Sequence, residues 1–188
     1  MSHSWAMVSS WGRMPARALA VALASSVLVQ GPATTPAAHF PSVSGDNLSK
    51  ATLHLPADFA GANGNLILIA FEREQQKDVD TWAVRAAVLE KSQPGFRFYE
   101  LPILPRRDIF YRWWLNTAMR SGVSEDAARA RTIPLYVGKE DFRKSLQIPS
   151  ERTITALLLN KQGDVVWRTE GPWSDDKQKQ LLSSLEHH

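Results

Sequence analysis

Four carboxylates follow directly after Asn65–Phe71, a run of seven almost entirely apolar residues. They are Glu72, Glu74, Asp78 and Asp80. Paired carboxylates can act as general acid and base when burial raises the pKa of one of them. Acids in the first turn of a helix also complement its dipole, and each then stabilises it by roughly 0.3–1 kcal/mol. Because that structural role needs no special pocket, it is our first interpretation, and a carboxylate-dependent hydrolase or isomerase is the alternative.

A second unusual segment, Arg106–Arg120, combines arginine with aromatic residues. Two adjacent tryptophans on a helix lie about 100° apart, so both cannot occupy the centre of a narrow core-facing stripe. Aromatic residues and arginine are enriched at binding hot spots and at membrane interfaces. We therefore predict a partner-binding surface, with the tryptophans as apolar anchors and the arginines as contacts to acidic groups or lipid phosphates. Its members are Arg107, Phe110, Arg112, Trp113, Trp114 and Arg120. Packing of both tryptophans within the domain is the alternative.

The composition excludes several classes of function. The chain has 188 residues and no cysteine, which rules out thiol catalysis, disulfides and metal sites built on thiolates. No phosphate-binding loop, nucleophile elbow or calcium loop is present, so we expect no metal and no cofactor. The formal charge is +3, and a charge this small does not favour nucleic-acid binding.

The N-terminal region has the layout of an export signal. A mainly apolar run of twelve residues, Ala18–Val29, follows Arg13 and Arg17, and small residues and prolines come next. The run is too short to cross a bilayer comfortably. We predict that residues 1–38 are a signal peptide or signal anchor and that residues 39–186 form one domain. The protein would then be periplasmic, or tethered to the extracytoplasmic side of a membrane. Organelle targeting is the remaining alternative.

The apolar run Asn65–Phe71 is predicted to be a central strand, because a strand buried on both faces lacks the alternation of a half-exposed one. A helix over Asp78–Ser92 should follow, with one apolar face. That face contains Val79, Trp82, Ala83, Ala86 and Leu89. In open α/β sheets, ligands gather at the carboxyl ends of strands, so the turn between this strand and helix is the first place to seek a site.

The remaining pattern predicts further strands and helices on either side of this unit. In order, they are an N-terminal hairpin within Phe40–Leu55, a parallel strand at Phe96–Leu104, a helix at Arg106–Gly122, a helical segment from Ser124, a strand at Thr132–Val137, a helix at Lys139–Gln147, an antiparallel hairpin of Thr153–Leu159 and Val165–Thr169, and a final helix capped by Ser174. Pro134 should confine part of the strand Thr132–Val137 to a sheet edge or to an irregular stretch. The order predicts an α/β/α sandwich around a mixed sheet.

Two segments resemble the thioredoxin-like superfamily: NLILIAF followed by a helix, and ALLLNKQGDVVWRTEG followed by a last helix. The N-terminal hairpin resembles the extra strands of peroxiredoxins and exported thioredoxin-like proteins. Shorter motifs, among them Phe98-Tyr-Glu-Leu-Pro102 and Val166-Trp-Arg, are similar to the mitochondrial ATP synthase assembly-factor family and its bacterial relatives. That resemblance implies a chaperone for a membrane-embedded subunit.

The chain departs from the redox members of the superfamily at both of their hallmarks. Gln75, Gln76 and Val79 stand where the resemblance would place Cys-x-x-Cys, and Thr153-Ile-Thr155 stands where it would place a cis-proline. Disulfide exchange and peroxide reduction are excluded, because a thiolate must attack in both reactions. We therefore expect a non-redox domain that binds a protein partner, with contact to a membrane surface, during assembly of a membrane complex.

Overall fold

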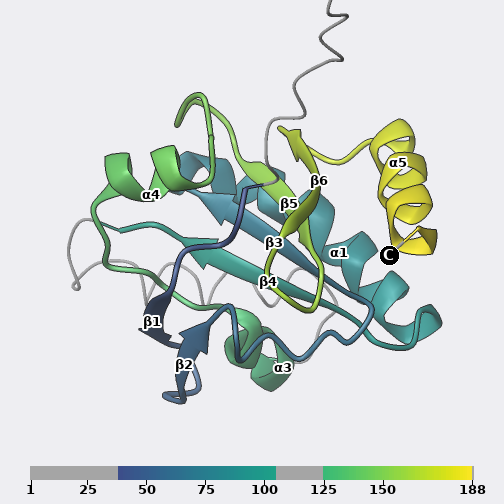
Figure 1. Ribbon diagram of the computed structural model, residues 1–188, viewed down its shortest axis with the longest axis horizontal. Helices are drawn as coiled ribbons and strands as arrows, with labels where there is room; N and C mark the ends of the chain where they lie inside the picture. The colour runs from purple at the N-terminus through teal and green to yellow at the C-terminus, as the bar shows by residue number, and fades with distance from the viewer. Residues whose placement is uncertain (1–37, 105–124, 188) are drawn as a thin grey trace, which may run out of the picture. The chain divides into compact units, whose positions relative to one another are not determined.

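The computed structural model describes residues 38–104 and 125–187 (Figure 1). A four-stranded sheet has the order β4-β3-β5-β6. Strand β3 (Gly64–Ala70) lies between β4 (Phe96–Pro102), to which it is parallel, and β5 (Thr155–Leu159), to which it is antiparallel. Strand β6 (Val165–Glu170) forms an antiparallel hairpin with β5. The predicted mixed sheet and its buried central strand are confirmed, since all seven residues of β3 are buried.

The N-terminal hairpin forms a separate two-stranded sheet, β1 (Val43–Asp46) with β2 (Thr52–Leu55). Before it, the segment 38–40 pairs with the start of β6: Phe40 N donates to Gly163 O at 2.8 Å, and Val165 N donates to Ala38 O at 2.8 Å. Gly163 has φ +93°, a left-handed conformation that favours glycine in this turn. The extra N-terminal strands are thus attached to the sheet through the β5–β6 hairpin.

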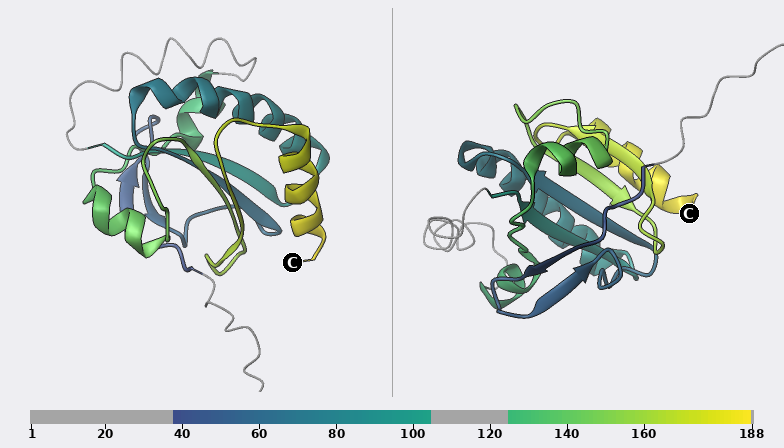
Figure 2. Two further views of the ribbon diagram at one scale, coloured as in Figure 1. Left: turned by 90° about the horizontal axis from the view of Figure 1, so that it is seen from above. Right: turned by 60° about the vertical axis from the view of Figure 1, so that its left-hand side comes forward.

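Two layers cover the sheet (Figure 2). Helices α1 (Gln76–Ser92) and α5 (Asp175–Glu186) pack on one face, where α1 buries all five predicted apolar residues. Helix α4 (Lys139–Ser145), the β1–β2 hairpin and Phe40 pack on the other face. Ser174 caps α5 as predicted, since its Oγ accepts a hydrogen bond from Lys177 N at 3.3 Å. The expected sandwich is confirmed in this part of the chain.

A cluster of three tryptophans joins α1 to the C-terminal elements. Trp82 is fully buried, and its indole N–H donates to Gly171 O at 3.0 Å. Its ring centroid lies 5.0 Å from that of Trp173 and 6.1 Å from that of Trp167, both in edge-on arrangements. Such geometry is favourable for aromatic pairs. Trp167 and Trp173 are therefore packing residues.

The predicted strand Thr132–Val137 is wrong. After α3 (Glu125–Arg131), only two isolated parallel bridges connect this segment to the β4 edge, Glu100 with Thr132 and Ile103 with Leu135. Ile133 N and Leu135 N donate to Glu100 O and Pro102 O, both at 2.9 Å. A regular ladder would next need an N–H from Pro102, which proline lacks. Pro102 of the partner strand β4 therefore interrupts the ladder, whereas the sequence analysis expected Pro134 to limit the strand.

Three further expectations concern residues that the structure does not describe. Residues 1–37 of the predicted leader lie outside the described residues. So do the whole predicted helix Arg106–Gly122 and the whole predicted partner-binding surface. Within the described ranges, no helix is long and apolar enough to cross a membrane.

Candidate functional site

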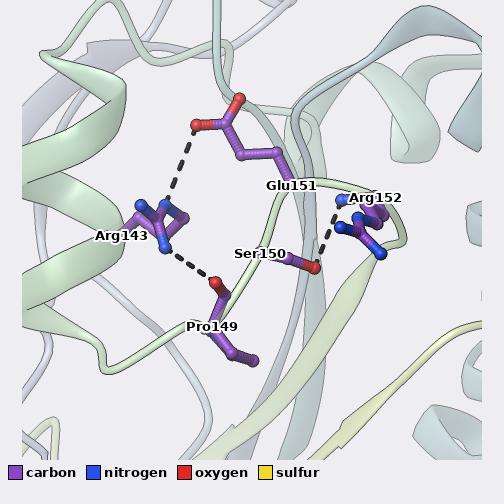
Figure 3. A pocket seen from close by; sticks show the side chains of 5 residues that line it. All are labelled: Arg143, Pro149, Ser150, Glu151 and Arg152. Atoms are coloured by element: carbon purple, nitrogen blue, oxygen red, sulfur yellow. Dashed lines mark hydrogen bonds and ion pairs between the residues drawn. The ribbon is translucent and has the colours of Figure 1, made fainter.

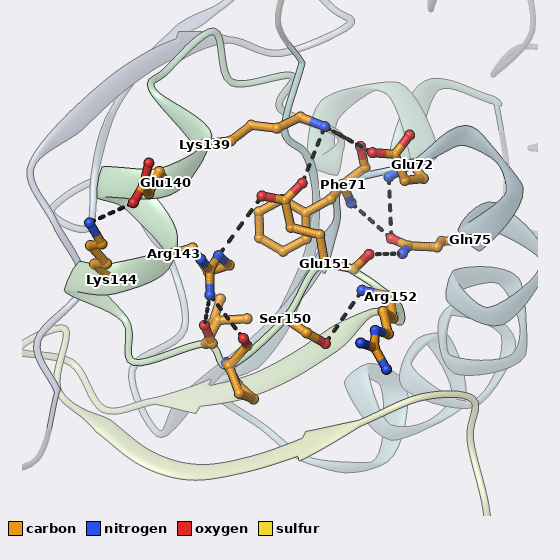
Figure 4. A network of polar contacts seen from close by, with 12 residues as sticks. Phe71, Glu72, Gln75, Lys139, Glu140, Arg143, Lys144, Ser150, Glu151 and Arg152 are labelled. Carbon is orange, nitrogen blue, oxygen red and sulfur yellow. Dashed lines mark hydrogen bonds and ion pairs between the residues drawn. The ribbon is translucent and has the colours of Figure 1, made fainter.

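The turn after β3 is organised by the side chain of Gln75. A short 3₁₀ helix, η1 (Arg73–Gln75), connects β3 to α1, and Gln75 is 6% exposed. Its Oε1 accepts hydrogen bonds from Phe71 N at 2.9 Å and Glu72 N at 3.3 Å. Its Nε2 donates to Glu151 O at 2.6 Å, in the loop before β5 (Figure 4). One buried amide therefore ties the carboxyl end of the central strand to a loop 76 residues away.

Lys139, the first residue of α4, reaches the same turn (Figure 4). Its Nζ donates to Phe71 O and to Glu72 Oε1, both at 3.0 Å, and lies 3.6 Å from Glu151 Oε2. The Lys139 side chain is 23% exposed, whereas that of Glu72 is 56% exposed. Solvent therefore screens the Glu72 ion pair, which we expect to contribute less than about 1 kcal/mol. The bond to the Phe71 carbonyl is the more important contact, because it satisfies the end of a buried strand.

Arg143, one helical turn further along α4, holds the loop before β5. Its guanidinium donates to Ile148 O at 3.0 Å and Pro149 O at 2.9 Å, and its Nε lies 3.8 Å from Glu151 Oε1. The Glu151 carboxylate thus lies between two cations of α4, while its backbone carbonyl is bound by Gln75. We call Gln75, Lys139, Arg143 and Glu151, together with Glu72, the corner network.

A surface pocket of about 400 Å³ lies beside the corner network (Figure 3). Arg143, Pro149, Ser150, Glu151 and Arg152 line it. Arg152 N donates to Ser150 Oγ at 3.4 Å, and the Arg152 side chain is exposed. Two arginines and one glutamate border the pocket, so charged groups of both signs lie at its walls.

The structure gives different surroundings to three of the four carboxylates that the sequence analysis names, and the fourth, Asp78, lies in the first turn of α1. Glu72 binds Lys139, and Glu74 is exposed on η1. Asp80 accepts a hydrogen bond from Gln76 Nε2 at 3.0 Å, on the side of α1 that faces β4. The same Gln76 amide lies 3.4 Å from the buried Glu100 carboxylate of β4. Glu72 and Asp80 therefore have different neighbours, which argues against their acting as one acid–base pair. In the described ranges, no three His, Asp or Glu side chains are grouped as metal ligands.

Most of the corner network is not predicted by the sequence. Gln75 is identified only as a residue at the position of a cysteine in redox thioredoxins. No sequence pattern indicates a role for Lys139, Arg143 or Glu151. One signal was present: Glu72 and Gln75 have the spacing of a capping box, and both of its reciprocal bonds form. The contacts to α4 and to the loop before β5 had no local signal, because they join segments more than 65 residues apart.

The fold is thioredoxin-like. BsSco, described as a member of the Sco family of cytochrome c oxidase assembly proteins, superposes with a TM-score of 0.59 at 15% identity, over 81% of this chain and 96% of that one. The thioredoxin domain of a thiol-disulfide oxidoreductase from Bacteroides vulgatus gives 0.54 at 15% identity, over 79% and 96%. A putative DsbE thiol:disulfide interchange protein from Chlorobium tepidum gives 0.54 at 12% identity, over 80% and 98%. No protein-family model and no curated protein sequence matches the chain. These likenesses establish the fold alone.

The corner network lies where the resemblance to redox thioredoxins would place their reactive thiol and cis-proline. The buried amide of Gln75 and three ion pairs lie at this corner, and the chain has no cysteine. The chemistry in the names of the oxidoreductase neighbours therefore cannot be carried out by this chain. What the arrangement does achieve is mechanical: it fixes the end of β3, the start of α4 and the loop before β5 relative to one another.

Proposed function

We propose that this chain is a non-redox thioredoxin-like domain that binds a protein partner. The observation that carries the proposal is the buried Gln75, whose amide links the turn after β3 to the loop before β5. A thiol-exchange site must leave a reactive group open to a second molecule. Gln75 uses both ends of its amide within the chain instead, so this corner serves structure. This chain has the thioredoxin-like fold without a reactive cysteine. We therefore infer that its surfaces serve to bind a protein partner.

The partner that we propose is a subunit of a membrane complex, bound during assembly on the extracytoplasmic side. Two sequence features support it: the export-type leader and the arginine–aromatic segment that holds Trp113 and Trp114. The name of BsSco offers an analogy, since it describes an assembly protein of cytochrome c oxidase. That analogy rests on the fold alone and gives no partner identity.

The test is recovery of the partner by the full chain from detergent-solubilised membranes of its native host. The double variant Trp114→Ala with Arg112→Glu should recover at least tenfold less partner, because truncation of a hot-spot tryptophan typically costs more than 1.4 kcal/mol. Arg85→Glu, at an exposed position on α1, is the matched control and should recover as much as the wild type.

Circular dichroism of both variants establishes that the fold is intact. With an intact fold, undiminished recovery by the double variant would remove the arginine–aromatic segment as the binding surface. If the wild-type chain recovers no protein beyond what a tag-only control recovers, the proposed function itself is wrong.

A further inference from the structure

The outer edge of β6 is uncovered along most of its length in the part of the chain that the structure describes. β6 is the last strand of the sheet, and only the segment 38–40 meets its outer side, at Gly163 and Val165. The opposite edge of the sheet differs, because Ile133 and Leu135 bond the outer side of β4. An open edge of this kind is a template for pairing with another strand.

A register shift in β6 ends the regular pairing with the segment 38–40. Val165 N bonds outward to Ala38 O, and the β5–β6 ladder then shifts register between Leu158 and Leu159. Beyond this shift, no other described segment forms a ladder or bridge with the outer edge from Trp167 to Glu170. We consider this part of the edge as a place for a strand from another molecule.

The hydrogen bonds on the inner side of β6 fix which residues can bond outward. Gly171 N donates to Ile154 O at 2.9 Å, and the register continues with Thr169 opposite Ala156. In an antiparallel pair, hydrogen-bonded and non-hydrogen-bonded positions alternate. Thr169 therefore bonds inward to β5, and the backbone N–H and C=O groups of Arg168 and Glu170 point outward. Lys177 Nζ already donates to Glu170 O at 2.6 Å, which leaves that oxygen its second lone pair.

This alternation leaves three registers in which two β6 edges pair about a two-fold axis. Arg168 can face Arg168, Glu170 can face Glu170, or Arg168 can face Glu170. Like charges directly opposite each other on neighbouring strands are destabilising, and opposite charges are stabilising. The third register alone pairs opposite charges, and it does so twice, once on each side of the axis.

We propose that two copies of this chain associate through their β6 edges, antiparallel, with Arg168 of each copy facing Glu170 of the other. The two-fold axis then passes between the two Thr169 residues. The two sheets become one continuous sheet of eight strands.

The charge pattern distinguishes this edge from one that only resists pairing. Charged side chains commonly protect an edge strand from unrelated strands. Arg168 and Glu170, two residues apart and both bonding outward, are complementary to their own copy in the antiparallel register. Because few residues take part, the contact belongs to the small, weak class of interfaces, and we expect a concentration-dependent equilibrium between monomer and dimer.

Charge reversal tests the register. By analytical ultracentrifugation of the full chain, Arg168→Glu and Glu170→Arg should each weaken dimerisation by about tenfold or more. The double variant Arg168→Glu with Glu170→Arg should restore it. Arg168 NH1 also donates to Gln147 O at 3.1 Å within one chain, and the double variant loses that contact too. Restoration would therefore report on pairing between chains.

A unique cysteine gives an independent measurement, because the natural chain has none. In the proposed register, Thr169 faces its own copy in a non-hydrogen-bonded pair, where Cα atoms lie about 4.5 Å apart. That distance permits a disulfide. Thr169→Cys should form a cross-linked dimer under mild oxidation, and Lys161→Cys, in the exposed β5–β6 turn, should not at the same concentration.

Two results would overturn the inference. One is a wild-type chain that stays monomeric up to high micromolar concentration, without a cross-link through Thr169→Cys. The other is a dimer whose affinity neither single charge reversal changes. Neither result bears on the proposed partner binding, which we assign to different residues.

Discussion

Replacing Gln75 by leucine removes three hydrogen bonds at once and keeps a side chain of similar size. The buried Phe71 N–H loses its partner, at a cost of about 1–3 kcal/mol for an unsatisfied donor. Glu72 N and Glu151 O are more accessible to water, so each should cost no more than an ordinary net hydrogen bond, about 0.5–1.5 kcal/mol. We expect Gln75→Leu to lower the free energy of unfolding by about 2–6 kcal/mol.

Urea unfolding of the full chain measures this loss, and amide hydrogen exchange locates it. The exchange rate at Phe71 N should rise more than that at amides in the middle of β3, because the lost bond is at the strand end. Glu74→Gln is the matched control: the side chain is exposed, and the change in unfolding free energy should stay within about 0.5 kcal/mol.

A second variant separates the two ends of the amide. Gln75→Glu keeps an acceptor for Phe71 N and Glu72 N but loses the donor to Glu151 O. Because the variant also buries a carboxylate and turns one of its oxygens toward the Glu151 carbonyl, its loss of stability at pH 7 should exceed that of the control. If Gln75→Leu unfolds within 0.5 kcal/mol of the wild type, or if exchange at Phe71 does not change, the corner network does not hold this part of the fold as we describe.

Two other perturbations have defined outcomes. Trp82→Ala should lower the free energy of unfolding by about 3–5 kcal/mol, because it opens a cavity in the core and removes the hydrogen bond to Gly171 O. Calorimetry measures this loss. Trp173 is only half-buried, so Trp173→Ala should lower the free energy of unfolding by less. The hydrogen bond from His39 holds the pKa of the Asp164 carboxyl below its usual value. The pair therefore stabilises the fold at pH values above the pKa of Asp164 in the unfolded chain, which is near 4. This stabilisation is lost as the pH falls through the lower pKa of Asp164 in the folded chain. Asp164→Asn should therefore be less stable than the wild type at pH 6 and differ little from it near pH 2, as urea titrations at the two values would show; an equal difference at both pH values would contradict this linkage.

The two-sided burial of β3 and the apolar face of α1 could be read from the chain, because both depend on periodicity within a single element. Val79, Trp82 and Leu89 recur at helical spacing, and all three are buried. The β5–β6 hairpin could also be predicted from the sequence, because its turn residues and flanking apolar runs are adjacent in the chain. From these elements and the absence of cysteine, the fold class and the loss of thiol chemistry both follow.

The segment Thr132–Val137 could not be predicted correctly from its own residues. Its own residues favour a strand, yet its ladder is broken by Pro102, a residue of the strand beside it. Hydrogen bonds between strands depend on both partners, and the sequence of one strand does not reveal which residue of another will lie opposite.

By itself, the amino-acid sequence determined the arrangement of the layers and excluded the chemistry that this scaffold supports elsewhere, because both depend on local pattern and residue type. Only the tertiary structure decided what replaced that chemistry. Gln75, Lys139 and Glu151 meet because β3, α4 and the loop before β5 converge at one end of the sheet. Long-range hydrogen bonds and ion pairs of this kind leave no periodic trace in a chain, so their partners become visible only once the chain has folded.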